Sequence, residues 1–177
     1  NHFLRQPNSL QELILTLRST QQKQLINSET LSMLEGVISV TEKQARDIMV
    51  PRPNMIVVNG EHTPEQALPI ITKSGHSRFP VVNEEHNTVN GILLAKDLLK
   101  TLNNKRMHNI QVHKLARPVK QIPESKRLDA LLKEFRESRN HIAIVIDEYG
   151  RTAGLVTIED VLEEIVGEIT DEYDAPE

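Results

Sequence analysis

An internal repeat is the feature that most constrains the fold of this chain. When residues 79–99 are written above residues 142–162, Gly91 falls on Gly154 and Asp97 falls on Asp160, both displaced by 63 positions without a gap. The same displacement upstream places Ala67 on Ala130. Because such self-similarity marks copies of one supersecondary unit that bury a core together, we expect two stacked copies.

Each copy follows the order β-α-β-β-α. In the first copy an apolar strand over residues 55–58 precedes a helix for which Thr63 is the N-cap, Pro64 the first residue and Gln66 the partner in a capping box. β-branched and aromatic runs on either side of a polar turn predict a hairpin, and a second helix follows it. The predicted hairpin strands and helix of the first copy are 79–82, 89–94 and 95–102. The corresponding predictions for the second copy are strands 119–122, 142–146 and 153–157 and helices 125–138 and 158–169, with Gly150 suited to a positive φ in its turn.

A helical segment precedes the repeats. Apolar residues at helical spacing in residues 9–19 and 28–40 predict two amphipathic helices. A third short helix is expected to begin at Thr41, with Gln44 reaching back, and Pro51 would end it. We therefore divide the chain into a helical lead-in (1–50), a first repeat (51–112) and a second repeat with an acidic C-terminal helix (113–177).

Composition narrows the class of protein. The 177 residues can bury a core, and the absence of cysteine excludes disulfides and thiolate metal sites, which suits a reducing compartment such as the cytosol. A net charge of -4 and 3% aromatic residues argue against a nucleic-acid partner. Apolar runs are shorter than the roughly 18 residues of a membrane span. We expect a cytoplasmic fragment, since the sequence begins with Asn rather than Met, and its parent protein could carry a membrane domain.

Two such copies, each ending in Gly-apolar-apolar-x-x-x-Asp, resemble a tandem pair of cystathionine β-synthase (CBS) domains. The strings RDIMVPR, SGHSRFPVV, GILLAKDLL, HIAIVIDEYG and GLVTIEDVLEEIVGEITDEYD are similar to those of the CorC/HlyC group of magnesium and cobalt efflux proteins, which are related to the CNNM transporters. The resemblance spans residues 9–174. It implies an α+β fold in which two β-α-β-β-α repeats pack about a pseudo-two-fold axis.

The same resemblance implies a site for an adenine nucleotide at the end of the second copy. A helix start suits phosphate, the hydroxyl of Thr157 would add to it, and the carboxylate of Asp160 can accept hydrogen bonds from ribose hydroxyls. By resemblance, apolar side chains would sandwich the adenine and two polar residues would line the phosphate side; these are Ile56, Ile142 and Leu155, and Ser77 and His141. The alternative is that Asp160 only caps its helix and Thr157 is an ordinary strand residue.

The first copy departs from this pattern. Leu94 occupies the place of Thr157, whereas Asp97 remains and Arg78 and Lys96 add positive charge. Either this half-site is empty, or its two cations hold phosphate without the hydroxyl. Arg78 could instead pair with acids as a structural cation. We predict one principal nucleotide and a secondary half-site at Arg78, Lys96 and Asp97.

The C-terminal acidic stretch allows two interpretations. An apolar stripe over Val161, Leu162, Ile165, Val166 and Ile169 indicates a helix with one packed face and one solvated acidic face. Alternatively, its acids could attract Mg²⁺, and those considered are Glu163, Glu164, Glu168 and Asp171. Mg²⁺ that arrives with ATP phosphates fits better than a protein cage, so we predict no dedicated metal site.

The sequence lacks the spacing of a zinc site, a phosphate-binding loop or a nucleophile elbow, and we expect no enzymatic activity. The resemblance instead implies a regulatory module that binds AMP, ADP or ATP, with or without Mg²⁺, and couples binding to magnesium and cobalt efflux. The expected partners are a second copy, bound through the CBS helices, and a membrane transport domain. The alternative is a structural dimerisation module that binds no ligand.

Overall fold

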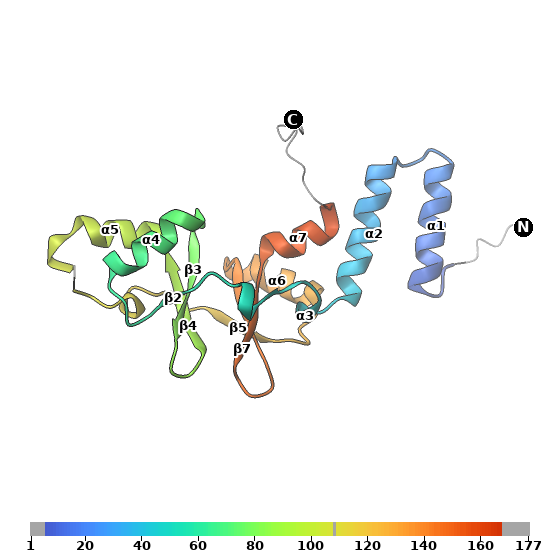
Figure 1. The fold of residues 1–177 in the computed structure, drawn as a ribbon. Coiled ribbons are helices and arrows are strands. Elements are labelled where there is room, and N and C mark those ends of the chain that lie inside the picture. Colours follow the sequence, from blue (N-terminus) through green and yellow to red (C-terminus); the bar gives the residue numbers. More distant parts are fainter. Residues whose placement is uncertain (1–5, 108, 168–177) are drawn as a thin grey trace, which may run out of the picture.

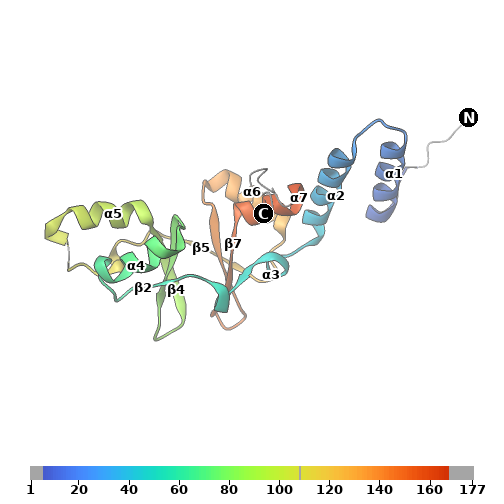
Figure 2. The ribbon, with the colours of Figure 1, turned by 45° about the horizontal axis from the view of Figure 1, so that its top comes forward.

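The computed structural model describes residues 6–107 and 109–167 (Figure 1). In chain order the helices are α1 (Leu10–Gln22), α2 (Ser28–Glu42), α3 (Ala45–Ile48), α4 (Pro64–Ser74), α5 (Ala95–Asn103), α6 (Leu128–Ser138) and α7 (Ile158–Val166). The strands are β1 (Val50–Pro51), β2 (Val58–Asn59), β3 (Arg78–Asn83), β4 (Thr88–Leu94), β5 (Lys120–Pro123), β6 (Ile142–Ile146) and β7 (Thr152–Thr157). Figure 2 shows an elongated molecule, with the first repeat at one end, the second repeat in the middle and the α1–α2 hairpin at the other end.

The two repeats form two separate sheets. The first has the strand order β2-β3-β4 and the second the order β1-β7-β6-β5. In each repeat the first strand runs parallel to the next, and a hairpin then adds the third strand in antiparallel direction. Helices α4 and α5 belong to the first sheet and α6 and α7 to the second, so the predicted α+β fold with two β-α-β-β-α repeats is confirmed.

Each repeat is entered by a segment that pairs with the other repeat. Strand β1, which precedes the first repeat, pairs with β7 of the second through the partners Val50–Leu155 and Pro51–Gly154. The linker before the second repeat pairs with β4 of the first, where the N–H groups of Ile92 and Arg117 donate to each other's carbonyls at 2.9 and 2.8 Å. These two backbone pairings are equivalent in the two repeats, and together they hold the repeats side by side.

The structural register of the repeats differs from the ungapped alignment. Val58 pairs with Val81 in the first sheet, and Ile122 pairs with Val145 in the second. Val58 therefore corresponds to Ile122 and Val81 to Val145, so the two repeats are displaced here by 64 positions. The displacement returns to 63 after the hairpin, because the first hairpin closes between Asn83 and Thr88 and the second, with one residue fewer, between Asp147 and Arg151.

The shift corrects the upstream alignment. Ala67 corresponds to Leu131, and both side chains are fully buried, whereas Ala130 is exposed. Residues one position apart on a helix point in different directions, so only one of them can face the core. Burial therefore identifies Leu131 as the equivalent of Ala67, although Ala130 is the same residue type.

Three clusters of buried apolar residues form the core. One lies within the first repeat, and a second combines the second repeat with Val40 and Ala45 of the lead-in. The third lies between the repeats and joins Val82 and Ile92 of the first with Ile142 and Ile144 of the second. Burying a Val or Ile side chain contributes about 1.5–3 kcal/mol to the free energy of unfolding. Because the third cluster takes side chains from both repeats, each repeat stabilises the other.

The predicted element ends were partly wrong. Thr41 does not cap a third helix: its hydroxyl donates to the carbonyl of Ile38 at 2.6 Å inside α2, and α3 begins after Gln44 instead. The strand predicted at 55–58 shrinks to β2, because Met55 ends a 3-10 turn. The helix predicted from 125 begins at Leu128.

Local turn and cap chemistry was confirmed where the sequence specified it. The Thr63 hydroxyl accepts from the N–H of Gln66 at 3.4 Å, and the Gln66 side chain accepts from the N–H of Thr63 at 2.9 Å. Gly150 has a φ of 78° in the second hairpin turn. Both are short-range interactions that the sequence specifies without the rest of the fold.

Helix α2 covers part of the apolar stripe of α7. A β-carbon added at Gly36 would lie 2.5 Å from the carbonyl oxygen of Ile165, so the two backbones are in contact. Lys43 forms an ion pair with Glu164 at 2.5 Å beside this contact. Leu162 and Val166 stay exposed. The predictions for Glu168, Ile169 and Asp171 lie outside the described residues.

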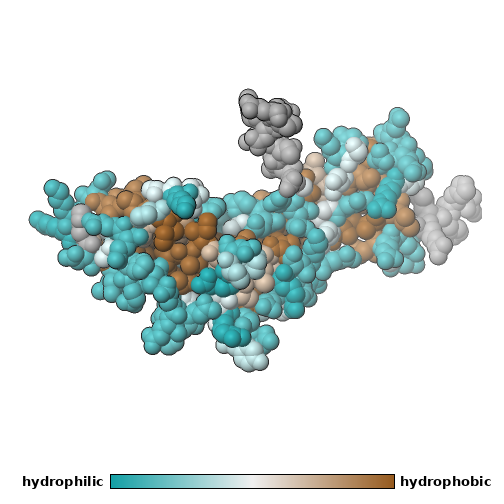
Figure 3. Space-filling view, viewed as in Figure 1, coloured by the Kyte–Doolittle hydropathy of each residue, from teal (hydrophilic) through white to brown (hydrophobic). Residues whose placement is uncertain are grey.

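Helix α1 packs mainly on α2. No residue of α1 is buried, and it contacts α2 alone among the larger element contacts. Figure 3 shows hydrophobic surface left of the centre of the view, over the first sheet, and again over α1 and α2. The lead-in is thus anchored to the second repeat through α2, whereas α1 extends away from it.

Candidate functional site

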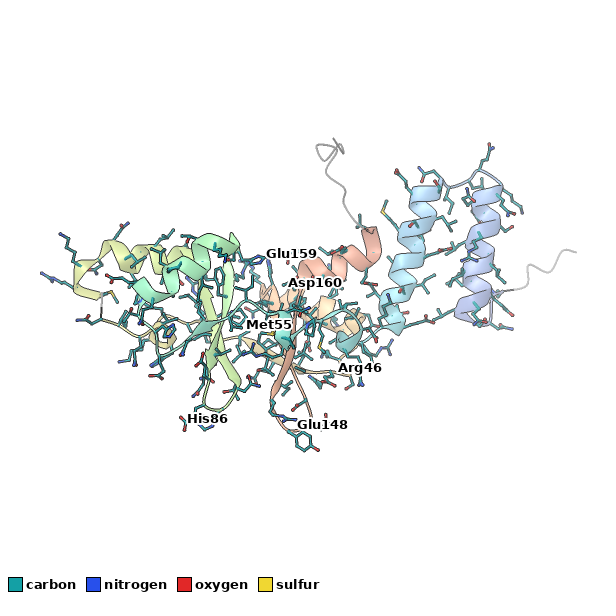
Figure 4. The ribbon with its side chains drawn as sticks, viewed as in Figure 1. Arg46, Met55, His86, Glu148, Glu159 and Asp160 are labelled. Carbon is teal, nitrogen blue, oxygen red and sulfur yellow. The ribbon has the colours of Figure 1, made fainter. Side chains whose placement is uncertain are left out.

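A cleft of about 480 Å³ lies between the repeats, and we call it the principal cleft. All seven residues that the sequence assigned to the nucleotide line it: Ile56, Ser77, His141, Ile142, Leu155, Thr157 and Asp160. They come from both repeats. Figure 4 shows Glu159 and Asp160 at the start of α7, on the side that faces the first repeat, with Met55 close to them.

The transition from β7 to α7 positions Thr157 and Asp160. No loop separates the two elements, so Thr157 is both the last strand residue and the N-cap, with φ −103° and ψ 162°. Its hydroxyl accepts from the N–H of Asp160 at 3.2 Å, and Asp160 Oδ2 accepts from the N–H of Thr157 at 2.9 Å. Asp160 therefore caps its helix and also lines the cleft, so its capping role leaves a ligand role open.

The walls of the principal cleft are apolar and come from both repeats. Ile142 is buried, Leu155 is half-buried, and Ile56 on the opposite repeat is exposed toward the cleft. Val50 of β1 also lines it, next to its strand partner Leu155. Two facing apolar walls with a polar helix start at one end suit a flat ring attached to a polar group.

The polar residues Ser77 and His141 lie at equivalent places in the two repeats. The carbonyl of Ser77 accepts from the N–H of Ala95, the first residue of α5, at 2.9 Å. The carbonyl of His141 accepts from the N–H of Ile158, the first residue of α7, at the same distance. The backbone of Ser77 and that of His141 thus each join the start of a hairpin to the start of the helix that follows it. The side chains of both residues line the principal cleft.

A second cleft, of about 250 Å³, adjoins the first, and we call it the basic cleft. Arg78 and Lys96 line it as the sequence predicted for the secondary half-site, together with Arg117 and Arg139, which the sequence reasoning missed. Asp97 is instead held by Arg117, whose Nε and Nη2 donate to its carboxylate at 2.9 and 3.1 Å. Leu94 is the N-cap of α5 and provides no side-chain cap.

The two clefts share three lining residues, namely Arg78, His141 and Ile142. The alternative role of Arg78 as a structural cation finds no support, because Arg78 forms no ion pair within the part of the chain that the structure describes. The two clefts are therefore neighbours along one surface between the repeats.

Metal ligands do not gather at the site. Among residues 6–107 and 109–167, no group of three or more His, Asp or Glu could hold a metal ion. Of the acids considered for Mg²⁺, Glu164 is paired with Lys43. None of the described helices is both long enough and apolar enough to cross a membrane.

Comparison with known proteins identifies the repeats. The CBS domain family matches residues 45–104 and 112–167. This chain belongs to the CBS domain family. A second family, described as the N-terminal region of NMB0537, matches residues 5–40 of the lead-in. The family match covers both copies of the repeat, which confirms the tandem CBS pair inferred from the sequence.

The chain is similar to CorC proteins. It is 50% identical over 176 residues to the magnesium and cobalt efflux protein CorC of Vibrio cholerae, a match that covers 99% of this chain and 60% of the relative. The corresponding match to CorC of Escherichia coli K12 is 47% identical over 172 residues. The chain thus spans about three fifths of the length of these relatives.

Solved structures give the same assignment. The CBS domain of a bacterial CNNM/CorC family Mg²⁺ transporter superposes with a TM-score of 0.84 at 38% identity, over 93% of this chain and all of that one. A CBS domain of this family in complex with ATP gives 0.73 at 40% identity, over 78% and 97%. A CBS-domain pair with bound AMP from Klebsiella pneumoniae gives 0.59 at 27% identity, over 70% and 98%.

Proposed function

We propose that this chain is the regulatory, adenine-nucleotide-binding CBS module of a CorC-type magnesium and cobalt efflux protein. The observation that carries the proposal is the convergence of seven residues from both repeats on the principal cleft, where Thr157 and Asp160 stand at the start of α7. The similar CBS structures solved with ATP and with AMP support it.

The geometry suggests a role for each part of the cleft. Ile56 on one repeat and Ile142 and Leu155 on the other would hold the adenine ring between them. One carboxylate oxygen of Asp160 caps α7, which leaves the other to accept from ribose hydroxyls. The helix start and the Thr157 hydroxyl would face the first phosphate. Ser77 and His141 would lie on that phosphate side.

The same helix offers a route from the nucleotide to the rest of the protein. Helix α7 begins at the principal cleft and packs against α2, so a ligand that draws the two repeats together also acts on the lead-in. Coupling then requires that the ligand bind one arrangement of the module more tightly than another. We propose that this difference is transmitted to a membrane transport domain, and that the module acts in the cytoplasm.

A calorimetric titration with AMP, ADP and ATP, each with and without Mg²⁺, tests the proposal. We expect at least one nucleotide to bind, and to raise the melting temperature of the chain by mass action. Asp160→Ala should abolish binding, whereas Asp97→Ala, which changes the equivalent carboxylate of the first repeat, should leave it measurable. Absence of binding by every nucleotide, or equal binding by Asp160→Ala, would refute the proposal.

A structural dimerisation module is the second candidate function. Leu99 on α5 and Leu162 on α7 occupy equivalent positions in the two repeats, and they are 54% and 43% exposed. We propose that they belong to a homodimer interface formed by the CBS helices. Leu162→Glu should convert a dimer to a monomer in sedimentation equilibrium. A dimer that binds no nucleotide would favour this function alone.

A further inference from the structure

Positive charge gathers in one stretch of this acidic chain. Residues 98–123 contain six Lys or Arg and no Asp or Glu, whereas the whole chain has 21 basic and 25 acidic residues. Two of the six are used within the fold, because Arg117 pairs with Asp97 and Lys120 pairs with Glu134. The other four are exposed and form no ion pair with a described residue; they are Lys100, Lys105, Arg106 and Lys114.

Three of these cations lie together at one end of the molecule. Lys100 lies in the last turn of α5, and Lys105 and Arg106 belong to the 3-10 turn that follows, which ends at Met107. This turn contacts α5, and the N–H of Met107 donates to the carbonyl of Asn104 at 3.0 Å. Figures 1 and 2 show α5 and the segment after it at the extremity of the first repeat, away from the lead-in. We call Lys100, Lys105, Arg106 and Met107 the distal surface.

The fold of the repeat does not require these charges. Lys100 corresponds to Glu163 on α7, the equivalent helix of the second repeat, and both residues are exposed. Helix α4, which packs against α5, carries one acid and one base, Glu65 and Lys73, so it leaves the excess of positive charge unchanged. An exposed position that is acidic in one repeat and basic in the other has no structural need for either charge. The unpaired cations therefore favour a negatively charged partner.

The place and composition of the distal surface favour a broad partner over a small anion. None of its four residues lines the principal cleft or the basic cleft. Single-stranded nucleic acid normally stacks on aromatic side chains, and residues 98–123 contain no Phe, Tyr or Trp. Met107 instead offers an apolar side chain that is 36% exposed beside two cations. This combination suits a bilayer surface, where cations meet lipid phosphates and an apolar group enters the headgroup region.

We propose that the distal surface docks this chain on a membrane that contains anionic lipids. In the docked state Lys100, Lys105 and Arg106 lie against headgroup phosphates, and Met107 enters the boundary between headgroups and acyl chains. The acids of α7 lie on the second repeat, in the middle of the molecule (Figure 1), and salt screens exposed charges beyond about 8–10 Å. The proposal is independent of nucleotide binding, because the distal surface shares no residue with either cleft.

Cosedimentation of the 177-residue chain with lipid vesicles tests the proposal. The test vesicles contain equal parts of phosphatidylglycerol and phosphatidylcholine, and vesicles of phosphatidylcholine alone are the reference. At low ionic strength we expect the chain to bind the anionic vesicles about tenfold or more tightly than the reference vesicles. High salt should release it, because the contacts between cations and headgroups are screened.

A triple variant removes the cations of the distal surface. Lys100→Gln, Lys105→Gln and Arg106→Gln together should weaken binding to the anionic vesicles about a hundredfold, because each cation near such a surface contributes about fivefold. The matched control removes three exposed cations elsewhere that form no ion pair among the described residues, with the changes Lys23→Gln, Lys133→Gln and Arg136→Gln. It should bind within about twofold of the wild type. Both triple variants should keep the wild-type melting temperature.

Met107→Ser distinguishes a bilayer from other polyanions. It should weaken binding to the anionic vesicles about threefold or more, because the apolar insertion is lost, and it should leave elution from a heparin column unchanged. Failure of the wild type to bind the anionic vesicles, equal losses in the two triple variants, or an unchanged Met107→Ser variant would overturn the proposal. Tighter binding of the wild type to a duplex oligonucleotide than to the vesicles would also overturn it, in favour of nucleic acid.

Discussion

Thr157 and Asp160 cap each other at the start of α7, with the Thr157 hydroxyl accepting from the N–H of Asp160 at 3.2 Å and the Asp160 carboxylate accepting from the N–H of Thr157 at 2.9 Å. The same pair lines the principal cleft. A capping box is a stability device, and its position between the repeats makes it available to a ligand. The stability role and the ligand role of these residues can therefore be measured separately.

The capping box of α4 provides the control for that separation. Thr157→Ala should lower the free energy of unfolding by about 1 kcal/mol, because one N–H at the start of α7 loses its acceptor. Thr63→Ala should cost a similar amount at α4, where the box with Gln66 lies away from the principal cleft. Chemical denaturation and calorimetry should show that Thr157→Ala also weakens the nucleotide and Thr63→Ala does not. Equal affinities in the two variants would leave Thr157 a helix cap only.

The two aligned glycines should tolerate no side chain. A β-carbon at Gly91 would lie 2.7 Å from the carbonyl oxygen of Arg117, and one at Gly154 would collide with the carbonyl oxygen of Val50. In both cases the colliding atom is backbone of the segment that enters the other repeat, so it cannot move aside as a side-chain end could. We expect Gly91→Ala and Gly154→Ala to lower the free energy of unfolding by about 1–3 kcal/mol each.

Asn90→Ala is the control for these two variants, because Asn90 is exposed beside Gly91, and urea denaturation should find it near neutral. Gly154→Ala should also weaken the nucleotide, since Val50 lines the principal cleft. A neutral Gly154→Ala would mean that β1 does not cross over this glycine in solution.

Gly36 should be needed for the contact between α2 and α7. Alanine normally stabilises a helix interior by about 1 kcal/mol relative to glycine. At Gly36 the added carbon would lie 2.5 Å from the Ile165 carbonyl oxygen, so we expect Gly36→Ala to be destabilising instead. Hydrogen exchange should then show faster exchange in α2 and α7, with α4 and α5 unchanged. A stabilised Gly36→Ala variant would contradict the packing of α2 on α7.

Glu134 on α6 should give the protein a pH-dependent part of its stability. Ion pairs with Lys120 and then Lys126, at 2.7 and 2.8 Å, hold the pKa of Glu134 below its ordinary value of 4.5. Because the pKa is lower in the folded state, the contribution is complete above pH 4.5 and is lost as the pH falls through the folded pKa.

Glu134→Gln should therefore be less stable than the wild type at pH 7 by about 1 kcal/mol, and the difference should shrink toward about pH 3.5. Glu137→Gln, an exposed carboxylate on the same helix, is the control and should show little difference at either pH. Urea denaturation at the two pH values measures both. A Glu134→Gln deficit that is independent of pH would show that the ion pairs with the two lysines do not contribute.

The sequence by itself determined the repeated β-α-β-β-α order and the α+β fold, whereas the wall residues of the principal cleft were assigned by resemblance to CBS domains. The order and the fold follow from local patterns: alternating apolar residues in the hairpins, cap residues such as Thr63, and a repeat whose two copies must bury their apolar faces together. The same local patterns placed Thr157 and Asp160 at a helix start. Their assignment to a nucleotide came from resemblance to CBS domains and stays a proposal.

The tertiary structure decided what depends on contacts between distant segments. The register shift from 64 to 63 arises from one residue in a hairpin loop, and only pairing with a neighbouring strand reveals it. The pairing of Asp97 with Arg117 and the contact of Gly36 with α7 join residues far apart in the sequence, which no local pattern encodes. Gly91 and Gly154 recur in the sequence as parts of a repeat. The fold explains why both positions are glycine: the backbone at Arg117 and at Val50 passes where a β-carbon at Gly91 or Gly154 would lie.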